Sequence, residues 1–393
     1  MRNIIGNAVS GEDFFERTKV INKITRSLEA GNHVYLSAPR RVGKTSIMNY
    51  LQENQWEGWH FIYEITESVG EIEEFYKILA KKVIESPVFR GLPKASDRLK
   101  KAAEKLIQHI NISVDLPFIK ISSQNTDKVS FHSEFEKILE ELDLNGKHLV
   151  LMIDEFPKTL ENIMTRQNKA EALRFLQVFR DLVHNPKISN KVQFLLTGSI
   201  GLPPIVKKLD GLHLITMLNI IEVPPLNFVE AEKMLLQILQ HYQVKIKDEA
   251  IKTILKEIDW LIPFHVQLAA QEIIDVFETE DKEIDNQLVR RAFNQILHHR
   301  NNIYFEIYLE RLKKNLDTPD YKFANDILEI IAKNDFIDKN DIHNKAVKNG
   351  VSETYKATLE SLVYDGYINN HDEANCYRFN SSIFKLWWKK YVC

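Results

Sequence analysis

The segment "HVYLSAPRRVGKTSIMNYL", residues 33–51, contains the residue types that bind the phosphates of a nucleotide. A phosphate-binding loop follows the pattern G-x-x-x-x-G-K-[ST], and here Ala38 replaces the first glycine. Lys44 can reach the outer phosphates, Thr45 can offer its hydroxyl to Mg²⁺, and Gly43 leaves the backbone N–H groups open to a phosphate. Because alanine is the smallest replacement for glycine, the segment still predicts a phosphate-binding loop.

A second segment, "HLVLMIDEFPKTL", places two carboxylates directly after an apolar run, residues 149–153. Such a run is typical of a strand buried on both faces, and ligands bind at the carboxyl ends of the strands in open α/β sheets. Asp154 can hold Mg²⁺, and Glu155 can orient and polarise an attacking water. The alternative is a solvated acidic strand end, which the neighbouring phosphate loop disfavours.

A third apolar segment, "KVQFLLTGSIG", ends in small hydroxyl residues. Thr197 and Ser199 are candidates to sense the γ-phosphate or the attacking water. Thr-Gly-Ser also forms ordinary turns, so this second interpretation stays open.

The elements that must position these residues follow from the hydrophobic pattern. Residues 33–37 are short and apolar, as in a buried strand, and Ile47, Met48 and Leu51 have helical spacing. The loop therefore lies at a helix N-terminus, where the dipole and free N–H groups favour anions. A helix is expected at residues 18–29, before this strand.

The rest of the chain alternates strands and helices and then becomes helical. Further strands are expected at 61–69, 191–201 and 217–226, with a helix at 71–85 and a capping box at Asn227 and Glu230. This order predicts an α/β fold with a parallel sheet in three layers and a helical lid. We expect a core at 1–225, in which 86–130 is an insertion, and a lid at 226–305. The insertion should be a charged helix followed by an extended or hairpin segment, serving as surface elaboration or binding a partner.

The last part, residues 306–393, has the pattern of a winged-helix domain. Helices are expected at 323–333, 339–349 and 352–364, followed by two short strands around a polar turn in "YINNHDEANCYRF". The final segment carries an aromatic stripe whose expected role is packing. The stripe consists of Phe384, Trp387, Trp388 and Tyr391.

Composition excludes several classes of protein. The net charge of −3 gives no overall basic field for nucleic acid, and two cysteines exclude a disulfide scaffold or a cysteine-rich zinc site. The first residues contain no apolar segment of signal-peptide length, and no apolar run approaches the ~20 residues of a membrane span. We therefore expect a protein of a reducing, cytoplasmic compartment with no membrane partner.

The motifs together resemble the STAND and archaeal-type ATPases of the AAA+ superfamily. "GEDFFERTKV" is similar to their N-terminal F-x-x-R-E segment, "APRRVGKTS" to their Walker A loop, "LMIDEFP" to their Walker B strand and "LLTGS" to their sensor strand. "PPL" is similar to the entry to their lid, and "YRFNSSIFKLWW" to the end of their winged-helix domain.

The resemblance implies a P-loop ATPase core with a helical lid and a winged helix, which uses ATP or ADP and Mg²⁺. Catalytic roles fall on Lys44, Glu155, Thr197 and Ser199, and metal binding on Thr45 and Asp154. The residues implied to bind nucleotide are Phe15, Arg17, Pro39, Arg40, Arg41, Val42, Gly43, Lys44, Thr45, Ser46 and Pro263.

The sequence also departs from the family pattern. Thr18 follows Arg17 where an acid is usual, and Leu261 stands where the lid normally has glycine, although Pro263 is retained. An arginine finger is expected between the sensor strand and Val223. This segment has two lysines, Lys207 and Lys208, and no arginine. A standard arginine finger is therefore missing. This implies slow hydrolysis or a finger from elsewhere, with Arg174 and Arg180 as candidates in an oligomer.

Two functions of different class fit these features. One is a regulatory ATPase whose nucleotide state moves the lid and winged helix and so signals to a protein partner. The other is a DNA-handling ATPase, similar to replication initiators or mobile-element ATPases. The expected recognition helix has Lys356 against three acids, and the wing has as many acids as basic groups, so charge disfavours the second function. The acids are Glu353, Glu360 and Asp365 in the helix and Asp372 and Glu373 in the wing, beside His371 and Arg378. A switch that binds nucleotide without hydrolysing it is a third option, against which Glu155 argues.

Overall fold

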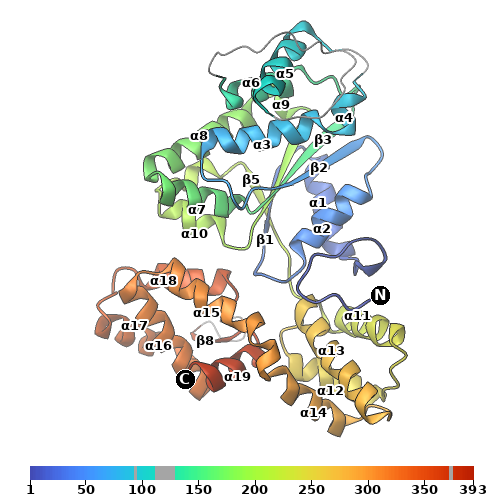
Figure 1. The fold of residues 1–393 in the computed structure, drawn as a ribbon. Helices are drawn as coiled ribbons and strands as arrows, with labels where there is room; N and C mark the ends of the chain where they lie inside the picture. Colours follow the sequence, from blue (N-terminus) through green and yellow to red (C-terminus); the bar gives the residue numbers. More distant parts are fainter. Residues whose placement is uncertain (93–94, 111–128, 371–374) are drawn as a thin grey trace. The chain divides into compact units, whose positions relative to one another are not determined.

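The computed structural model describes residues 1–92, 95–110, 129–370 and 375–393 (Figure 1). The chain divides into two compact units. We call residues 16–37 and 44–223 the core unit. The C-terminal unit comprises residues 1–15, 38–43 and 224–393.

The core unit is built on a five-stranded parallel sheet of order β2-β3-β4-β1-β5. Every strand expected from the sequence is present, with shorter bounds at several ends. Their bounds are β1 His33–Ser37, β2 Trp59–Ile65, β3 His148–Asp154, β4 Val192–Thr197 and β5 Leu218–Glu222. All six residues of β4 are buried, as expected for a central parallel strand covered on both faces.

Helices cover both faces of this sheet, which confirms the predicted α/β class. Figure 1 shows α1 and α2 on one side and α3, α7 and α8 on the other. The bounds are α1 Thr18–Glu29, α2 Lys44–Glu53, α3 Ile72–Ile84, α6 Phe131–Glu141, α7 Phe156–Arg166 and α8 Lys169–His184. Shorter helices are α9 Pro186–Ser189, α10 Leu202–Lys207 and η2 Leu212–Leu214.

An aromatic cluster holds α3, α7 and α8 on the sheet. The ring centroids of Phe75 and Phe175 are 4.9 Å apart, and those of Phe179 and Phe194 are 5.2 Å apart. Phe156, the first residue of α7, lies 4.9 Å from Phe179 and is fully buried. Because Phe156 follows the two predicted site carboxylates directly, this packing fixes the chain immediately after them.

The charged helix expected in the insertion is α5, Asp97–His109, which follows the short helix α4, Pro87–Arg90. Its apolar side, including Leu99 and Leu106, is buried in the same hydrophobic core as α3 and α6. The extended or hairpin segment expected after it lies largely in residues 111–128, outside the described residues.

The C-terminal unit begins with a helical block. Its elements are η1 Gly11–Asp13, α11 Phe228–His241, α12 Asp248–Ile258, α13 Pro263–Glu280, α14 Asn286–Ile296, η3 His299–Asn301 and α15 Ile303–Asn315. The capping box at the start of α11 is confirmed, since Asn227 accepts from the Glu230 N–H and Glu230 accepts from the Asn227 N–H.

The last residues form helices around a small antiparallel sheet of order β6-β8-β7. The elements are α16 Thr318–Asn334, β6 Ile337–Asp338, α17 Lys339–Lys348, α18 Tyr355–Tyr364, β7 Ile368–Asn369, β8 Cys376–Phe379 and α19 Ser382–Tyr391. Strand β6 was not predicted from the sequence, and the predicted start of α16 is too late and that of α18 too early. His371, Asp372 and Glu373 of the predicted wing lie outside the described residues.

The aromatic stripe of α19 packs inside this unit, as expected. Phe384, Trp387 and Trp388 are buried, and the Trp387 indole N–H donates to Asn302 Oδ1 at 3.1 Å. Tyr391 is partly exposed, and its hydroxyl donates to the Leu297 carbonyl at 2.7 Å. In the described part of the chain, no helix combines the length and apolarity that crossing a membrane requires.

Candidate nucleotide site

The predicted phosphate loop connects β1 to α2 and has two special backbone positions, which are separated by one residue. Arg41 has φ +66° and Gly43 has φ +96°, both in the left-handed region. A Cβ built on Gly43 would meet nothing within 4 Å, so there is room for a side chain. Glycine is favoured at this position because of the backbone angle φ of Gly43. Turns of this kind point successive N–H groups inward and form concavities that bind anions. Lys44 and Ser46, in the first turn of α2, are buried.

The order of the strands brings the three predicted segments together. In the register, Leu36 of β1 pairs with Thr197 of β4, and Ile153 of β3 pairs with Leu196. The carboxyl ends of the three strands are therefore level. Because β4 lies between β1 and β3, its end lies beside the end of β1, where the loop begins, and beside the acidic pair at the end of β3.

Asp154 is the most constrained of the predicted metal ligands. Its Oδ2 accepts hydrogen bonds from Thr45 Oγ1 at 2.7 Å and from Tyr63 Oη at 3.1 Å, and its Oδ1 accepts from the Glu155 N–H at 2.9 Å. Burial raises the pKa of Asp154, whereas the hydrogen bond from Thr45 lowers it. A hydroxyl has two lone pairs besides its proton, so Thr45 can donate to Asp154 and still ligate a metal.

Tyr63 is a site residue that the sequence analysis missed. It lies on β2, is partly buried, and burial followed by the charge of Asp154 raises its pKa. The hydroxyl therefore stays protonated and acts as a donor to Asp154. The sequence showed Tyr63 inside an expected strand, but its contact with Asp154 depends on the β2–β3 register, which no local pattern reveals.

Glu155 is fixed by the end of β4. Its Oε2 accepts from the Ser199 N–H at 3.0 Å and from Ser199 Oγ at 2.8 Å. The Glu155 backbone has φ +60°, an uncommon conformation for a residue with a side chain, and it caps the start of α7. Among the described residues, nothing donates to its other carboxylate oxygen, Oε1.

A glycine between the sensor hydroxyls permits this arrangement. A Cβ on Gly198 would lie 2.6 Å from Pro157 Cδ, so only glycine allows β4 to end against the start of α7. Thr197 is fully buried and donates to the Leu36 carbonyl at 3.2 Å, which ties β4 to β1. Its predicted part in sensing a phosphate stays a prediction.

The remaining predicted residues are spread over both units. Arg17 is buried in the core unit just before α1. Phe15 belongs to the C-terminal unit, as does Pro263, the first residue of α13. Loop residues 38–43, which include Pro39, Arg40 and Val42, also belong to it. Nucleotide contacts by these residues stay predictions.

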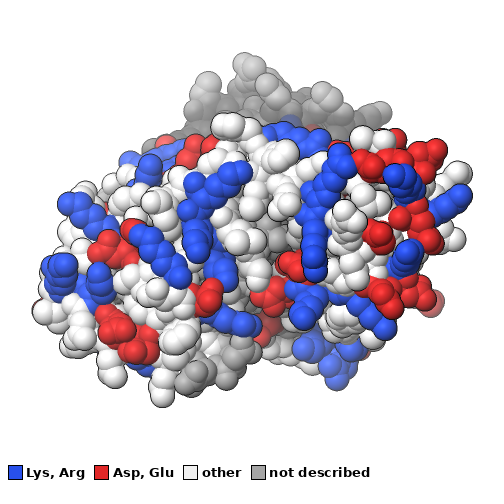
Figure 2. Space-filling model, turned by 90° about the horizontal axis from the view of Figure 1, so that it is seen from below, with Lys and Arg blue, Asp and Glu red and all other residues white. Residues whose placement is uncertain are grey.

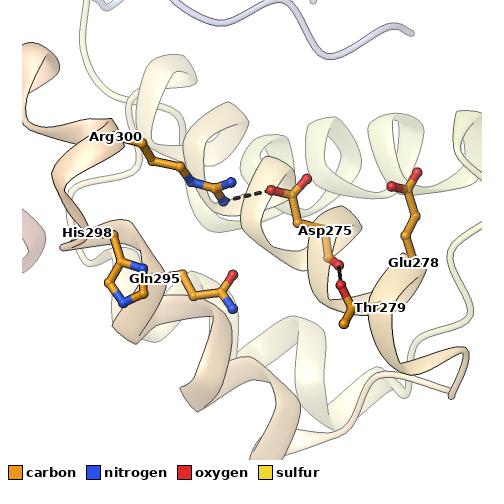
Figure 3. A pocket seen from close by; sticks show the side chains of 6 residues that line it. All are labelled: Asp275, Glu278, Thr279, Gln295, His298 and Arg300. Carbon is orange, nitrogen blue, oxygen red and sulfur yellow. Dashed lines mark hydrogen bonds and ion pairs between the residues drawn. The ribbon is translucent and has the colours of Figure 1, made fainter.

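The C-terminal unit also contains a polar hollow of about 410 Å³, none of whose lining residues was predicted to bind a ligand (Figure 3). Its charged groups are largely paired with one another. Arg300 bonds to Asp275 at 2.7 Å and also pairs with the buried Glu272. The hollow is therefore explained by ion pairs that hold α13 to η3.

Asp154 and Thr45 suit Mg²⁺ in their chemistry. Mg²⁺ is usually held by one or two carboxylates together with substrate phosphates, and it requires hard oxygen ligands. A buried carboxylate and an adjacent hydroxyl at the N-terminus of α2 meet this requirement, whereas a site for a softer metal would need imidazole or thiolate ligands.

The sequence matches no known family model and no curated protein. The structure resembles the Walker-type ATPase PABY2304 of Pyrococcus abyssi with a TM-score of 0.65 and 18% identity, over 98% of this chain and 99% of that one. It also resembles the ORC2 protein of Aeropyrum pernix, solved in ADPNP–ADP complexes, with a TM-score of 0.52 and 11% identity, over 92% of this chain and 88% of that one. The chain therefore has the fold of the AAA+ P-loop ATPases.

Two substitutions test the metal assignment. Asp154→Asn should remove the Mg²⁺-dependent part of nucleotide affinity, because the carboxylate charge is lost. Tyr63→Phe removes one donor to the same oxygen and should weaken the Mg²⁺-dependent part about tenfold. Calorimetric titration of ADP with and without Mg²⁺ measures both effects, and Tyr321→Phe in α16 is the matched control.

The raised pKa of Asp154 sets the direction of the pH dependence. Protonation of Asp154 removes the charge that holds Mg²⁺. As the pH is lowered, the Mg²⁺-dependent part of nucleotide affinity should therefore be lost at a higher pH than with an aspartate of ordinary pKa. Full Mg²⁺ dependence retained in Asp154→Asn would show that another group holds the metal.

Proposed function

We propose that this protein is a regulatory ATPase that binds ATP with Mg²⁺ and hydrolyses it slowly. One observation carries the proposal. At the carboxyl ends of the adjacent parallel strands β3 and β4, Asp154 accepts a hydrogen bond from the Thr45 hydroxyl of α2, and the neighbouring Glu155 accepts one from Ser199. The fold shared with P-loop ATPases supports the proposal, as does the nucleotide-bound state in which the ORC2 protein was solved.

The roles of the residues follow from their contacts. Lys44 and the loop N–H groups bind the phosphates, and Asp154 and Thr45 hold Mg²⁺, which supplies positive charge at the phosphoryl oxygens. Ser199 occupies Oε2 of Glu155 and leaves Oε1 to accept a proton from the attacking water. Ser199 therefore acts as a positioning residue, and Glu155 is the base that orients the water.

Slow turnover follows from the missing arginine. An arginine supplied to the transferring phosphoryl group is worth about 10³–10⁵ in rate in P-loop enzymes. Between β4 and β5 the chain has α10 and η2, with Lys207 and Lys208 at the end of α10. Arg174 on α8 is 67% exposed and only loosely paired with Glu171, at 3.5 Å. This side chain is available to the nucleotide of a second copy.

The regulatory role rests on where the loop is placed in the chain. The chain passes from the C-terminal unit to the core unit between Gly43 and Lys44, inside the phosphate loop itself. The loop proposed to hold the nucleotide is therefore made of residues from both units. We propose that ATP, ADP and the empty state differ in how the helical lid and the winged helix of the C-terminal unit are held, and that a protein partner reads this difference.

Glu155→Gln tests the catalytic assignment. The variant should bind ATP normally and lose about 10²–10³ in hydrolysis rate, the scale typical of one positioned group. Lys44→Ala is the contrasting variant and should lose nucleotide binding with the fold intact, because its charge is directed at phosphates. Phosphate release and calorimetry measure the two properties separately. Hydrolysis at the wild-type rate in Glu155→Gln would assign the base to another residue.

The source of an arginine finger can be tested by dilution. If Arg174 or Arg180 acts on the nucleotide of a neighbouring copy, specific ATPase activity should rise with protein concentration or with a partner. Arg174→Ala and Arg180→Ala should flatten that rise without changing ATP affinity. Fast turnover that is independent of concentration and insensitive to both substitutions would show that one chain holds a complete active site.

DNA handling is the alternative function, and surface charge does not favour it. In α18, the expected recognition helix, Lys356 is accompanied by Glu360, and Asp365 follows the helix end. Figure 2 shows lysine and arginine side chains on one face of the molecule with acidic side chains between them. A major-groove helix instead needs basic groups, because phosphate contacts dominate affinity.

A filter-binding titration with duplex DNA over a salt series separates the two functions. We expect weak binding with a shallow dependence on salt, as for a surface with few phosphate contacts. Tight binding whose logarithm falls steeply with the logarithm of salt concentration would favour the DNA-handling function instead.

A further inference from the structure

The first half of the phosphate loop is packed into the C-terminal unit through Arg41. The Arg41 guanidinium carbon lies 4.0 Å from the centre of the Phe264 ring, on the first turn of α13. It also lies 5.6 Å from the ring of Tyr304 and 5.7 Å from that of Tyr308, both on α15. All these residues belong to the same compact unit. Three aromatic rings from two helices therefore surround one loop cation.

A second loop residue is packed in the same unit. A Cβ built on Gly366 would lie 2.7 Å from Pro39 Cβ and 3.0 Å from Trp260 Cη2. Gly366 also has φ +83°, so both its backbone and the close approach of Pro39 call for glycine. The loop is thus anchored at Pro39, beside the turn that follows α18, and at Arg41, against α13 and α15.

The charge of Arg41 has no anionic partner in the described part of the chain. No carboxylate there pairs with its guanidinium, and no hydrogen bond involves it. Burial lowers the pKa of Arg41, and the nearby Arg311 lowers it further. The faces of aromatic rings carry the negative end of a quadrupole and attract a cation, most strongly where water is excluded. The rings therefore hold in place a positive charge that no carboxylate among the described residues neutralises.

The backbone of Arg41 explains why such an anchor is needed. A left-handed conformation is unfavourable for a residue with a long side chain and persists only where the surroundings fix it. The contact of the Arg41 guanidinium with the Phe264 ring, which we call the aromatic seat, provides this restraint. The loop geometry that directs N–H groups at a phosphate therefore depends on contacts with α13 and α15.

We propose that Arg41 is a positioning residue that couples nucleotide binding at the loop to the order of α13 and α15. The Phe264 seat holds the loop in the form that accepts phosphates, and bound phosphates in turn hold Arg41 on its seat. The inference rests on the proposed nucleotide binding and adds the route by which the C-terminal unit responds. Coupling between two events is reciprocal: the factor by which bound nucleotide favours the seat equals the factor by which the formed seat raises nucleotide affinity, so loss of the seat must weaken nucleotide binding.

A double-mutant cycle tests the coupling. Arg41→Gln removes the charge and keeps the long side chain, and Phe264→Leu removes the ring and keeps an apolar residue. Each should weaken ADP binding about 5- to 30-fold, the range expected for a desolvated cation–π contact. The double variant should bind ADP with about the affinity of whichever single variant binds ADP less tightly. Phe228→Leu, on the exposed side of α11 in the same unit, is the matched control and should not change affinity.

Two results would overturn the proposal. If the two losses multiply in the double variant, Arg41 and the Phe264 ring affect nucleotide affinity independently, and no coupling runs through their contact. If Phe264→Leu changes thermal stability but not ADP affinity, the seat has only a packing role. Wild-type protein that binds no ADP, and does not differ from Lys44→Ala, would refute the proposed function itself, which distinguishes the two failures.

Hydrogen exchange provides a second measurement that needs only the loop variant. In wild-type protein, ADP should slow amide exchange in the first turns of α13 and in α15 as well as in α2 and β3. In Arg41→Gln at saturating ADP, protection of α2 and β3 should remain and that of α13 and α15 should be lost. Protection of α13 and α15 that survives in Arg41→Gln would contradict the coupling even if Phe264→Leu fails to fold.

Discussion

The hydrogen bond between Thr45 and Asp154 is the contact around which the core unit is organised. It joins the first turn of α2 to the end of β3, two segments separated by 109 positions in the chain. The bond can form only because β4 lies between β1 and β3, with all three strands ending at the same level. The apolar composition of these strands fixes the sheet, and the sheet delivers polar groups to one edge. The chemistry of the site therefore follows from hydrophobic burial elsewhere.

Two of the unfavourable backbone conformations belong to residues of the predicted site. Arg41 and Glu155 are both left-handed residues with side chains, and each is held by a specific contact. Ser199 fixes the carboxylate of Glu155, and the Phe264 ring holds the guanidinium of Arg41. Strain of this kind persists only where neighbouring groups over-determine the conformation. Arg41 belongs to the predicted phosphate loop, and Glu155 carries the proposed catalytic carboxylate, so both restrained residues lie in segments to which we assign a function.

The sequence was sufficient where a feature depends on local pattern. Continuous apolar runs predicted β1, β3 and β4, helical spacing predicted α1 to the residue, and the capping box marked the start of α11. Features that depend on long-range register were missed. Tyr63 reaches Asp154 only through the pairing of β2 with β3, and β6 has two residues and forms by pairing with β8. Arg41 was assigned to the nucleotide as part of a motif, but the motif could not reveal the aromatic seat, because Phe264 and Tyr304 lie more than 200 positions away.

The division of the phosphate loop has a consequence for how such a protein can transmit a signal. If the whole loop belonged to the core, the C-terminal unit could respond only through groups that touch the nucleotide. Here residues 38–43 belong to the C-terminal unit, and Lys44 begins a core helix. Under the proposed function, a phosphate bound at Lys44 would act on the unit that contains α13 and α15 through the peptide between Gly43 and Lys44. Gly43, at φ +96° and without a side chain, gives that junction the conformational freedom to accommodate more than one arrangement of the loop.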